Sequence, residues 1–189
     1  MNVEACRLPA TRYAIINAIA VQATWFCAVI GGAAGLWWPG VLAAGITVLG
    51  HLAVRRDWRR EALRVGAAGL LGALVDTALI QAGFITILGG FGGANNATSI
   101  WMIALWLSFA TSLSAGLKML QRLRWWLVAI IGAVAGVVSY AGGAKLGALT
   151  FPPGAFTQGT WSALAAVATA WAMALPLLVA MTRNRGDHD

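Results

Sequence analysis

The chain has 189 residues and a net charge of +7, and 60% of its residues are hydrophobic while only 10% are charged. Soluble domains usually carry about 25% charged residues, so this composition excludes an ordinary soluble domain. The basic residues lie at the ends of apolar stretches rather than together on one folded face, which argues against a nucleic-acid partner. We therefore predict a single integral membrane domain over residues 1–189.

Six apolar stretches predict six transmembrane helices, since about 20 residues of helix cross a hydrocarbon core of roughly 30 Å. In chain order, we place the helices at about 13–32, 36–54, 63–84, 100–118, 125–148 and 160–182. The glycine-rich segment 84–95 disfavours a continuous helix, and it is either a loop or a short re-entrant piece. The predicted fold class is an all-α membrane protein built as a bundle of six transmembrane helices.

Connections with and without Lys or Arg alternate along the chain, so the basic residues gather on one side of this predicted bundle. Twelve of the thirteen Lys and Arg residues precede the first span, join spans two and three or four and five, or follow span six. Lys145, near the outer end of span five, is the exception. Positively charged connections of membrane proteins stay in the cytoplasm, so we predict that both chain ends are cytoplasmic (N-in, C-in).

Metal and disulfide chemistry have little support in this sequence. Cys6 and Cys27 flank the first span, and one straight helix would hold them roughly 30 Å apart, which is too far for a disulfide. The two histidines, His51 and His188, are too few for a typical metal centre. A nucleophile motif and a phosphate-binding loop are also missing, so we assign no catalytic residue, no metal and no cofactor.

Stripes of small residues predict close helix packing, because lipid supplies no hydrophobic drive for helices to associate. The clearest stripe is in span five, where small residues recur at steps of three or four: Gly132, Gly136, Ser139, Gly143 and Gly147. Spans three and four carry similar stripes. We therefore predict that spans three, four and five form the close-packed centre of the bundle.

Tryptophans mark the expected membrane boundaries, where indole rings lie at the level of the lipid headgroups. The outer boundary is predicted at Trp37, Trp38, Trp101 and Trp161. Three further tryptophans lie deeper in the spans, and their indole N–H groups need hydrogen-bond partners: Trp25, Trp106 and Trp171.

Asp76 is the only acidic residue deep in a predicted span, about 18 Å from Arg64 along the helix. A charge at that depth costs at least ~2.5 kcal/mol, so Asp76 is either protonated or faces partners inside the bundle. Residue counts from the basic span ends place other polar side chains near this depth. We predict a midplane binding layer formed by Asp76, Gln22, Ser108 and Tyr140, with Lys145 nearer the outer surface. Interhelical hydrogen bonding alone is the competing interpretation.

A second polar layer is predicted near the cytoplasmic boundary. Asn17 and His51 each lie within about 8 Å of a basic span end, and Glu61 at the start of span three is placed to join them. His51 is the one deep side chain that can change its charge near neutral pH. These residues either do acid–base work or fix the fold by interhelical hydrogen bonds, which contribute only ~0.6 kcal/mol on average.

Several of these residues belong to a recognisable pattern. Its most specific part, in span five, is Ser139-Tyr140-Ala141-Gly142-Gly143-Ala144-Lys145-Leu146-Gly147-Ala148. Weaker parts are Asn17, Gln22 and Trp25, then His51-Leu52, Glu61, Gly72-Ala73-Leu74-Val75-Asp76, Trp101, Ala104-Leu105-Trp106 and Phe109-Ala110. With this pattern the chain resembles the domain-of-unknown-function 2878 family of small bacterial inner-membrane proteins. The chain has Gly136-Val137-Val138 where this family is expected to have Gly-Pro-Leu.

The resemblance implies a fold and a bacterial inner-membrane location, but it implies no reaction. Members are thought to be encoded beside fatty-acid-modifying enzymes, which implies a role linked to lipids. The favoured function is a small transporter-like protein with a polar midplane site around Asp76, and the sequence favours a non-enzymatic role. Two alternatives stay open: a structural or assembly subunit of a membrane complex, and an intramembrane lipid-modifying enzyme that uses His51 and Glu61. The expected partners are the lipid bilayer and either a second copy of the chain or another membrane protein.

Overall fold

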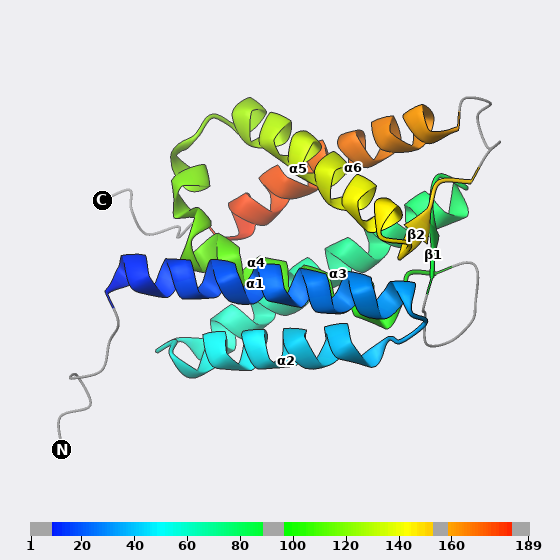
Figure 1. Cartoon of the computed structure of the whole chain (residues 1–189). Helices are drawn as coiled ribbons and strands as arrows, with labels where there is room; N and C mark the ends of the chain where they lie inside the picture. Colours follow the sequence, from blue (N-terminus) through cyan, green and yellow to red (C-terminus); the bar gives the residue numbers. More distant parts are fainter. Residues whose placement is uncertain (1–8, 89–96, 153–158, 183–189) are drawn as a thin grey trace, which may run out of the picture.

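The computed structural model describes residues 9–88, 97–152 and 159–182. These residues form six α-helices, one 3-10 helix and one pair of two-residue strands (Figure 1). The helices are α1 (Ala10–Ala33), α2 (Trp38–Ala53), α3 (Trp58–Gln81), α4 (Ile100–Ala115), α5 (Trp125–Lys145) and α6 (Thr160–Thr182). The 3-10 helix η2 (Leu117–Arg122) follows α4, and the strands are β1 (Thr86–Ile87) and β2 (Leu149–Thr150).

Four of these helices, α1, α3, α5 and α6, are long and apolar enough to cross a membrane. Helices α2 and α4 are apolar but have only 16 residues, which makes each about 24 Å long at 1.5 Å per residue. The predicted span 100–118 is too long, because the α-helix ends before Gly116 and the chain continues as η2.

Helix α3 starts five residues before the predicted span 63–84 and ends three residues earlier than predicted. Arginines are good helix formers, and they extend the helix beyond its apolar part to Trp58. At the other end the chain turns at Gly83, whose φ of 75° is a left-handed conformation that favours glycine. The predicted re-entrant segment 84–95 contains β1, and its residues 89–95 lie outside the described residues.

Helix α4 lies at the centre of the molecule and packs against α1, α2 and α3, and less extensively against α6. Helix α5 instead packs chiefly against α6 (Figure 1). The prediction that spans three, four and five form the centre is therefore wrong for span five. The glycine stripe of α5 does serve close packing, but the partner is α6: a Cβ atom at Gly132 would lie 2.5 Å from the carbonyl oxygen of Trp171.

Two stacked indoles connect the two parts of the bundle. The rings of Trp106 on α4 and Trp171 on α6 lie 4.5 Å apart between centroids with an interplanar angle of 20°. Each ring also lies against a glycine: a Cβ atom would lie 2.0 Å from Trp106 Cγ at Gly72, and 2.4 Å from Trp171 Cγ at Gly136. Glycines of α3 and α5 thus provide the space that these rings occupy.

The ends of the helices opposite the basic connections are joined by β1 and β2, which pair antiparallel with Thr86 opposite Thr150. Trp101 lies beside this pair and donates its indole N–H to the carbonyl oxygen of Leu88 at 3.0 Å. Only 1% of Trp101 is exposed, because the ring fits against Gly32 of α1. The prediction that Trp101 anchors the membrane boundary is therefore wrong.

We predict that Gly72→Ala destabilises the protein, since the new methyl group overlaps the Trp106 ring and overpacking costs about 1–3 kcal/mol. The matched control is Gly66→Ala on the same helix, where a Cβ atom meets nothing within 4 Å. The measurement is the melting temperature of the detergent-purified variants. Equal melting temperatures for the two variants would contradict the close contact at Gly72.

Candidate functional site

The first candidate site is centred on Asp76, which is completely buried. Trp106 Nε1 donates a hydrogen bond to Asp76 Oδ2 at 2.8 Å, and Tyr140 Oη donates to Asp76 Oδ1. The carboxyl group therefore joins α3, α4 and α5. Within the described part of the chain, no ion pair involves Asp76. Its polar environment is neutral: Trp106 and Tyr140 donate hydrogen bonds to it, and the Thr98 side chain lies nearby.

The other predicted members of this layer are placed differently. Ser108 is fully buried, and its hydroxyl has no hydrogen-bond partner among the described residues. Gln22 is exposed on α1, and Lys145 is exposed in the last turn of α5. The structure thus brings Asp76 and Tyr140 together but not Lys145. Asp76 lies five residues before the end of α3, about 8 Å from that end at 1.5 Å per residue.

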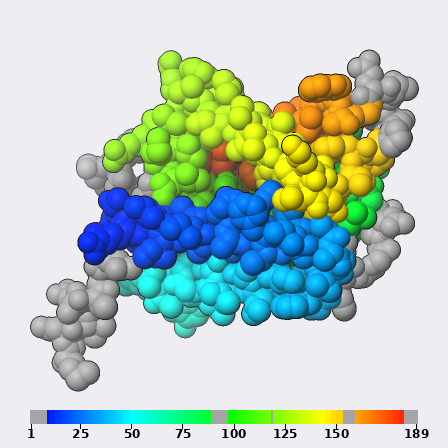
Figure 2. Space-filling view, in the orientation of Figure 1, coloured from blue at the N-terminus to red at the C-terminus, as the bar shows by residue number. Residues whose placement is uncertain are grey.

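A lateral groove adjoins this site. It has a volume of about 210 Å³ and lies between α1, α4 and α5, with Trp171 of α6 contributing to its wall. Figure 2 shows the hollow between α1 and α5, with part of α6 visible at its bottom. The lining residues are Val21, Gln22, Trp25, Met102, Leu105, Trp106, Phe109, Ala135, Ser139, Tyr140 and Trp171. Most are apolar or aromatic, and three of them offer uncharged amide or hydroxyl groups.

Two groove residues are also hydrogen-bond donors to the buried carboxyl group of Asp76. Trp106 and Tyr140 both line the groove and both donate hydrogen bonds to Asp76. Across the groove, Trp25 Nε1 donates to Ser139 Oγ at 2.9 Å and so joins α1 to α5. Asp76 therefore holds two side chains of the groove wall in place, although it does not line the groove itself.

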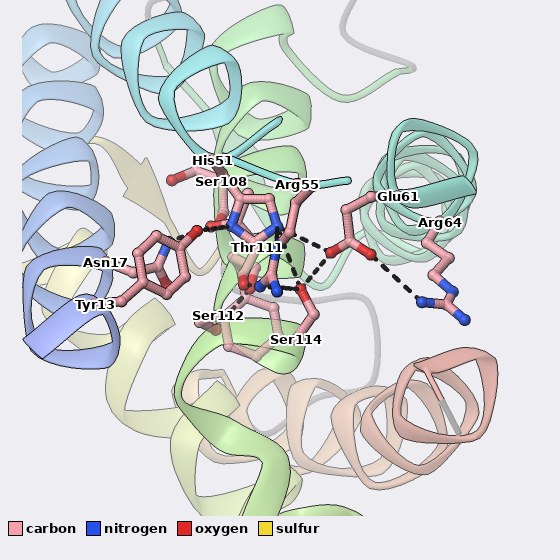
Figure 3. A network of polar contacts seen from close by, with 11 residues as sticks. Tyr13, Asn17, His51, Arg55, Glu61, Arg64, Ser108, Thr111, Ser112 and Ser114 are labelled. Carbon is pink, nitrogen blue, oxygen red and sulfur yellow. Dashed lines mark hydrogen bonds and ion pairs between the residues drawn. The ribbon is translucent and has the colours of Figure 1, made fainter. Parts of the chain in front are cut away.

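A second candidate site lies at the other end of the bundle, where four helices contribute polar side chains (Figure 3). Tyr13 Oη lies 2.6 Å from His51 Nδ1, and His51 Nε2 lies 2.9 Å from Glu61 Oε1. Ser114 Oγ donates to the same Glu61 oxygen. His51 and Glu61 are both buried. An ionised carboxylate only accepts hydrogen bonds, so Nε2 of a neutral His51 carries the proton and Nδ1 accepts from Tyr13.

Two arginines border this network. Arg64 Nη1 lies 3.4 Å from Glu61 Oε2. Arg55 lies on the other side, where its Nη2 donates to Ser114 Oγ at 3.4 Å and its guanidinium carbon lies 5.3 Å from the centroid of the Tyr13 ring. The network as a whole therefore has more cationic groups than acidic ones.

Asn17, predicted in the same layer as His51 and Glu61, makes no direct hydrogen bond to either of these described residues and reaches them through α4. Its Nδ2 donates to Thr111 Oγ1 at 2.9 Å, one turn deeper along α1. Its Oδ1 has no hydrogen-bond partner within the described residues. Thr111 in turn accepts a hydrogen bond from Ser114 Oγ at its carbonyl oxygen, at 3.3 Å, so Asn17 joins the network at its edge through α4 (Figure 3).

The sequence interpretation missed Tyr13, Arg55 and Ser114, and it did not connect Trp106 to Asp76. Tyr13 and Arg55 were assigned to span ends, where polar residues usually contact water or headgroups. A signal was present in α4, since Ser108, Thr111 and Ser114 are spaced three residues apart and therefore share one helix face. For Trp106, the need of a buried indole N–H for an acceptor was the available signal.

Comparison with known proteins supplies a family but no activity. A family described as "Protein of unknown function (DUF2878)" matches residues 14–177. No curated protein and no solved structure matches the chain.

We predict that Asp76 and Tyr140 are energetically coupled. Asp76→Asn replaces one acceptor oxygen by an amide group, and Tyr140→Phe removes one donor, so the double variant loses less stability than the sum of the single losses. The expected coupling is about 0.5–3 kcal/mol, measured as unfolding free energies of the four proteins in one detergent. The control pairs Asp76→Asn with Thr169→Val, whose exposed hydroxyl bonds only within α6, and these two changes should be additive. A coupling near zero for the first pair would contradict the hydrogen bond.

Proposed function

Because that match covers most of the chain, the protein belongs to the DUF2878 family, and we propose that it is a six-span bacterial inner-membrane protein that binds a lipid-like molecule. The observation that carries the proposal is the lateral groove between α1, α4 and α5, which backs onto the Asp76 site. This proposal develops the transporter-like interpretation and gives the groove, rather than the carboxyl group alone, the role of binding the ligand.

The lining of the groove indicates the kind of ligand. A cavity of about 150 Å³ with apolar walls is large enough for benzene, and this groove is larger at about 210 Å³. Its aromatic and aliphatic walls suit an acyl or similar hydrocarbon chain. Gln22, Ser139 and Tyr140 offer hydrogen bonds to one polar group of the ligand, since a few placed polar groups usually orient a ligand in an apolar pocket.

Asp76 acts in this proposal as a positioning residue. It contacts the groove only through Trp106 and Tyr140, whose donor groups it accepts. A buried carboxyl group with two such bonds keeps both side chains in one orientation, because leaving either donor unpaired costs about 1–3 kcal/mol. The shape of the groove therefore depends on Asp76 without contact between Asp76 and the ligand.

The proposal includes the predicted topology, with both chain ends in the cytoplasm. In support, the start of α1, the α2–α3 and α4–α5 connections and the end of α6 lie at one end of the molecule (Figure 1). These are the connections that carry the basic residues. The short helices α2 and α4 cross the hydrocarbon layer in this proposal where the bilayer is locally thinner, an adjustment of modest cost.

We expect a green fluorescent protein fused to the chain end to fluoresce, since the C-terminus is cytoplasmic in the proposed topology. A second fusion, with alkaline phosphatase inserted in the connection between α5 and α6, should be active because this enzyme matures only outside the cytoplasm. If the green fluorescent protein fusion is expressed normally but does not fluoresce, and the phosphatase fusion is inactive, the proposed orientation is wrong and the C-terminus lies outside the cytoplasm.

A second candidate function has one specific observation in its favour. General acid–base catalysis needs its groups within hydrogen-bond reach, and His51 Nε2 lies 2.9 Å from Glu61 Oε1. The cavity that borders Glu61 has a volume of only about 10 Å³, which is room for about one water molecule. This small space favours the groove as the place where a lipid-like molecule binds.

The groove is tested by filling it. Ala135→Phe places a phenyl ring at the groove wall, and we expect it to weaken labelling of α1 and α5 by a photoactivatable fatty acid by at least about fivefold, as for an overpacking cost of 1 kcal/mol or more. The control is Val134→Phe, which adds a similar ring at an exposed position outside the groove lining. Labelled peptides from purified protein are located by mass spectrometry.

The other outcomes separate the alternatives. Equal labelling of both variants would refute the groove as the binding site. Stoichiometric co-purification of another membrane protein, with no labelling of the groove, would favour an assembly subunit. Chemical conversion of the bound lipid that is lost in His51→Asn would favour the enzyme.

A further inference from the structure

Arg55 is held in a fixed position beside the second candidate site (Figure 3). It follows the last residues of α2, and contacts from three helices orient it. Its guanidinium group lies over the Tyr13 ring of α1, its Nε lies 3.4 Å from His51 Nε2 of α2, and its Nη2 donates to Ser114 Oγ of α4. An arginine with so many orienting contacts loses little side-chain entropy when it binds a further partner.

The guanidinium group has binding capacity left. An arginine carries five N–H donors in one plane, and the hydrogen bond to Ser114 engages one of them. The Tyr13 hydroxyl group is a further neighbour of the guanidinium group. Arg55 Nε lies 3.4 Å from His51 Nε2, but this His51 nitrogen carries its own proton and therefore accepts no hydrogen bond. Arg55 is only partly buried, so part of its side chain is accessible at the surface of the bundle. No ion pair within the described residues includes Arg55.

The charges around Arg55 compensate its own charge only in part, because the nearby acid Glu61 is shared with other cations. Glu61 is the acid of the network, and it already contacts His51 and Arg64. One carboxylate thus faces two arginines. Arg56 and Arg59, both exposed, add to the positive potential on the same connection.

We propose that Arg55 is the centre of a phosphate-binding site at the membrane boundary, and that the bound group is the phosphate of an anionic lipid headgroup. The planar fork of an arginine matches two phosphate oxygens, and basic residues just outside a membrane helix attract anionic lipids by about 1 kcal/mol each. Tyr13, His51 and Ser114 position the arginine. The site shares no residue with the groove, because Arg55 and its neighbours Tyr13, His51 and Ser114 do not line it.

The test measures lipid binding to the purified full-length chain by native mass spectrometry. Phosphatidylglycerol is compared with phosphatidylcholine of the same acyl chains, and inorganic phosphate is the soluble competitor. We expect the wild type to prefer phosphatidylglycerol, and Arg55→Gln to lose about 10- to 100-fold in its affinity, as for charged hydrogen bonds worth 1.5–3 kcal/mol. Arg55→Lys, which retains the charge but not the fork, should lose most of this preference as well.

The matched control is Arg56→Gln, which removes the same charge from the neighbouring exposed position and should change the affinity less than about threefold. The melting temperatures of Arg55→Lys and the wild type are also compared. Similar values would show that a loss of lipid binding in Arg55→Lys does not come from misfolding. Equal losses for Arg55→Gln and Arg56→Gln would overturn the site in favour of diffuse surface charge. Binding of phosphate without preference between the two lipids would assign the site to free phosphate, and the absence of both effects would refute it.

Discussion

The stacked rings of Trp106 and Trp171 are the contact on which the arrangement of α3, α4, α5 and α6 depends. Each ring lies on a glycine of a different helix, Gly72 for Trp106 and Gly136 for Trp171. In lipid, helices associate through packing and interhelical hydrogen bonds rather than through the hydrophobic effect. A large flat ring against a glycine backbone provides a large contact area, so the two tryptophans connect the α5–α6 pair to the central helix α4.

The same rings explain why an acidic residue is tolerated inside the bundle. Trp106 donates its N–H to Asp76, and Tyr140, whose ring lies edge-on to Trp171, donates its hydroxyl group. A carboxyl group that is buried without partners would be expensive in a membrane. Here the donors are supplied by side chains that the packing already holds in place. Packing, polar satisfaction and the wall of the groove therefore rest on one cluster.

Residue counting along helices predicted part of this arrangement. Because the rise per residue of a helix is nearly constant, residue counts predicted similar depths in the membrane for Asp76 and Tyr140. The same counts placed His51 and Glu61 at the same end of the bundle. Depth says nothing about which helices are neighbours. The partner of the glycine stripe was therefore missed: the sequence shows Gly132 and Gly136 as a small-residue face, but not that Trp171 fills it.

Rotation around each helix is the other quantity that the sequence left undetermined. Trp101 is a tryptophan near a span end, which is typical of a residue at the membrane boundary. It is nevertheless buried, because Gly32 of the neighbouring helix leaves room for its ring. Tyr13 and Arg55 similarly lie at span ends, where contact with water is the usual expectation. They turn inward because His51 and Ser114 provide hydrogen-bonding partners, and such mutual contacts follow only from the assembled bundle.

The hydrogen bond from Trp25 to Ser139 joins α1 to α5 across the groove, whereas α6 connects the α5–α6 pair to the rest of the bundle through α3 and α4. Hydrogen bonds between membrane helices contribute only ~0.6 kcal/mol on average, close to the thermal energy. The bond therefore breaks and re-forms readily. Opening this bond removes a polar link between α1 and α5 without breaking a backbone hydrogen bond of either helix. In the proposed function, the entrance of the groove can therefore widen for a bulky hydrocarbon chain at little cost in free energy.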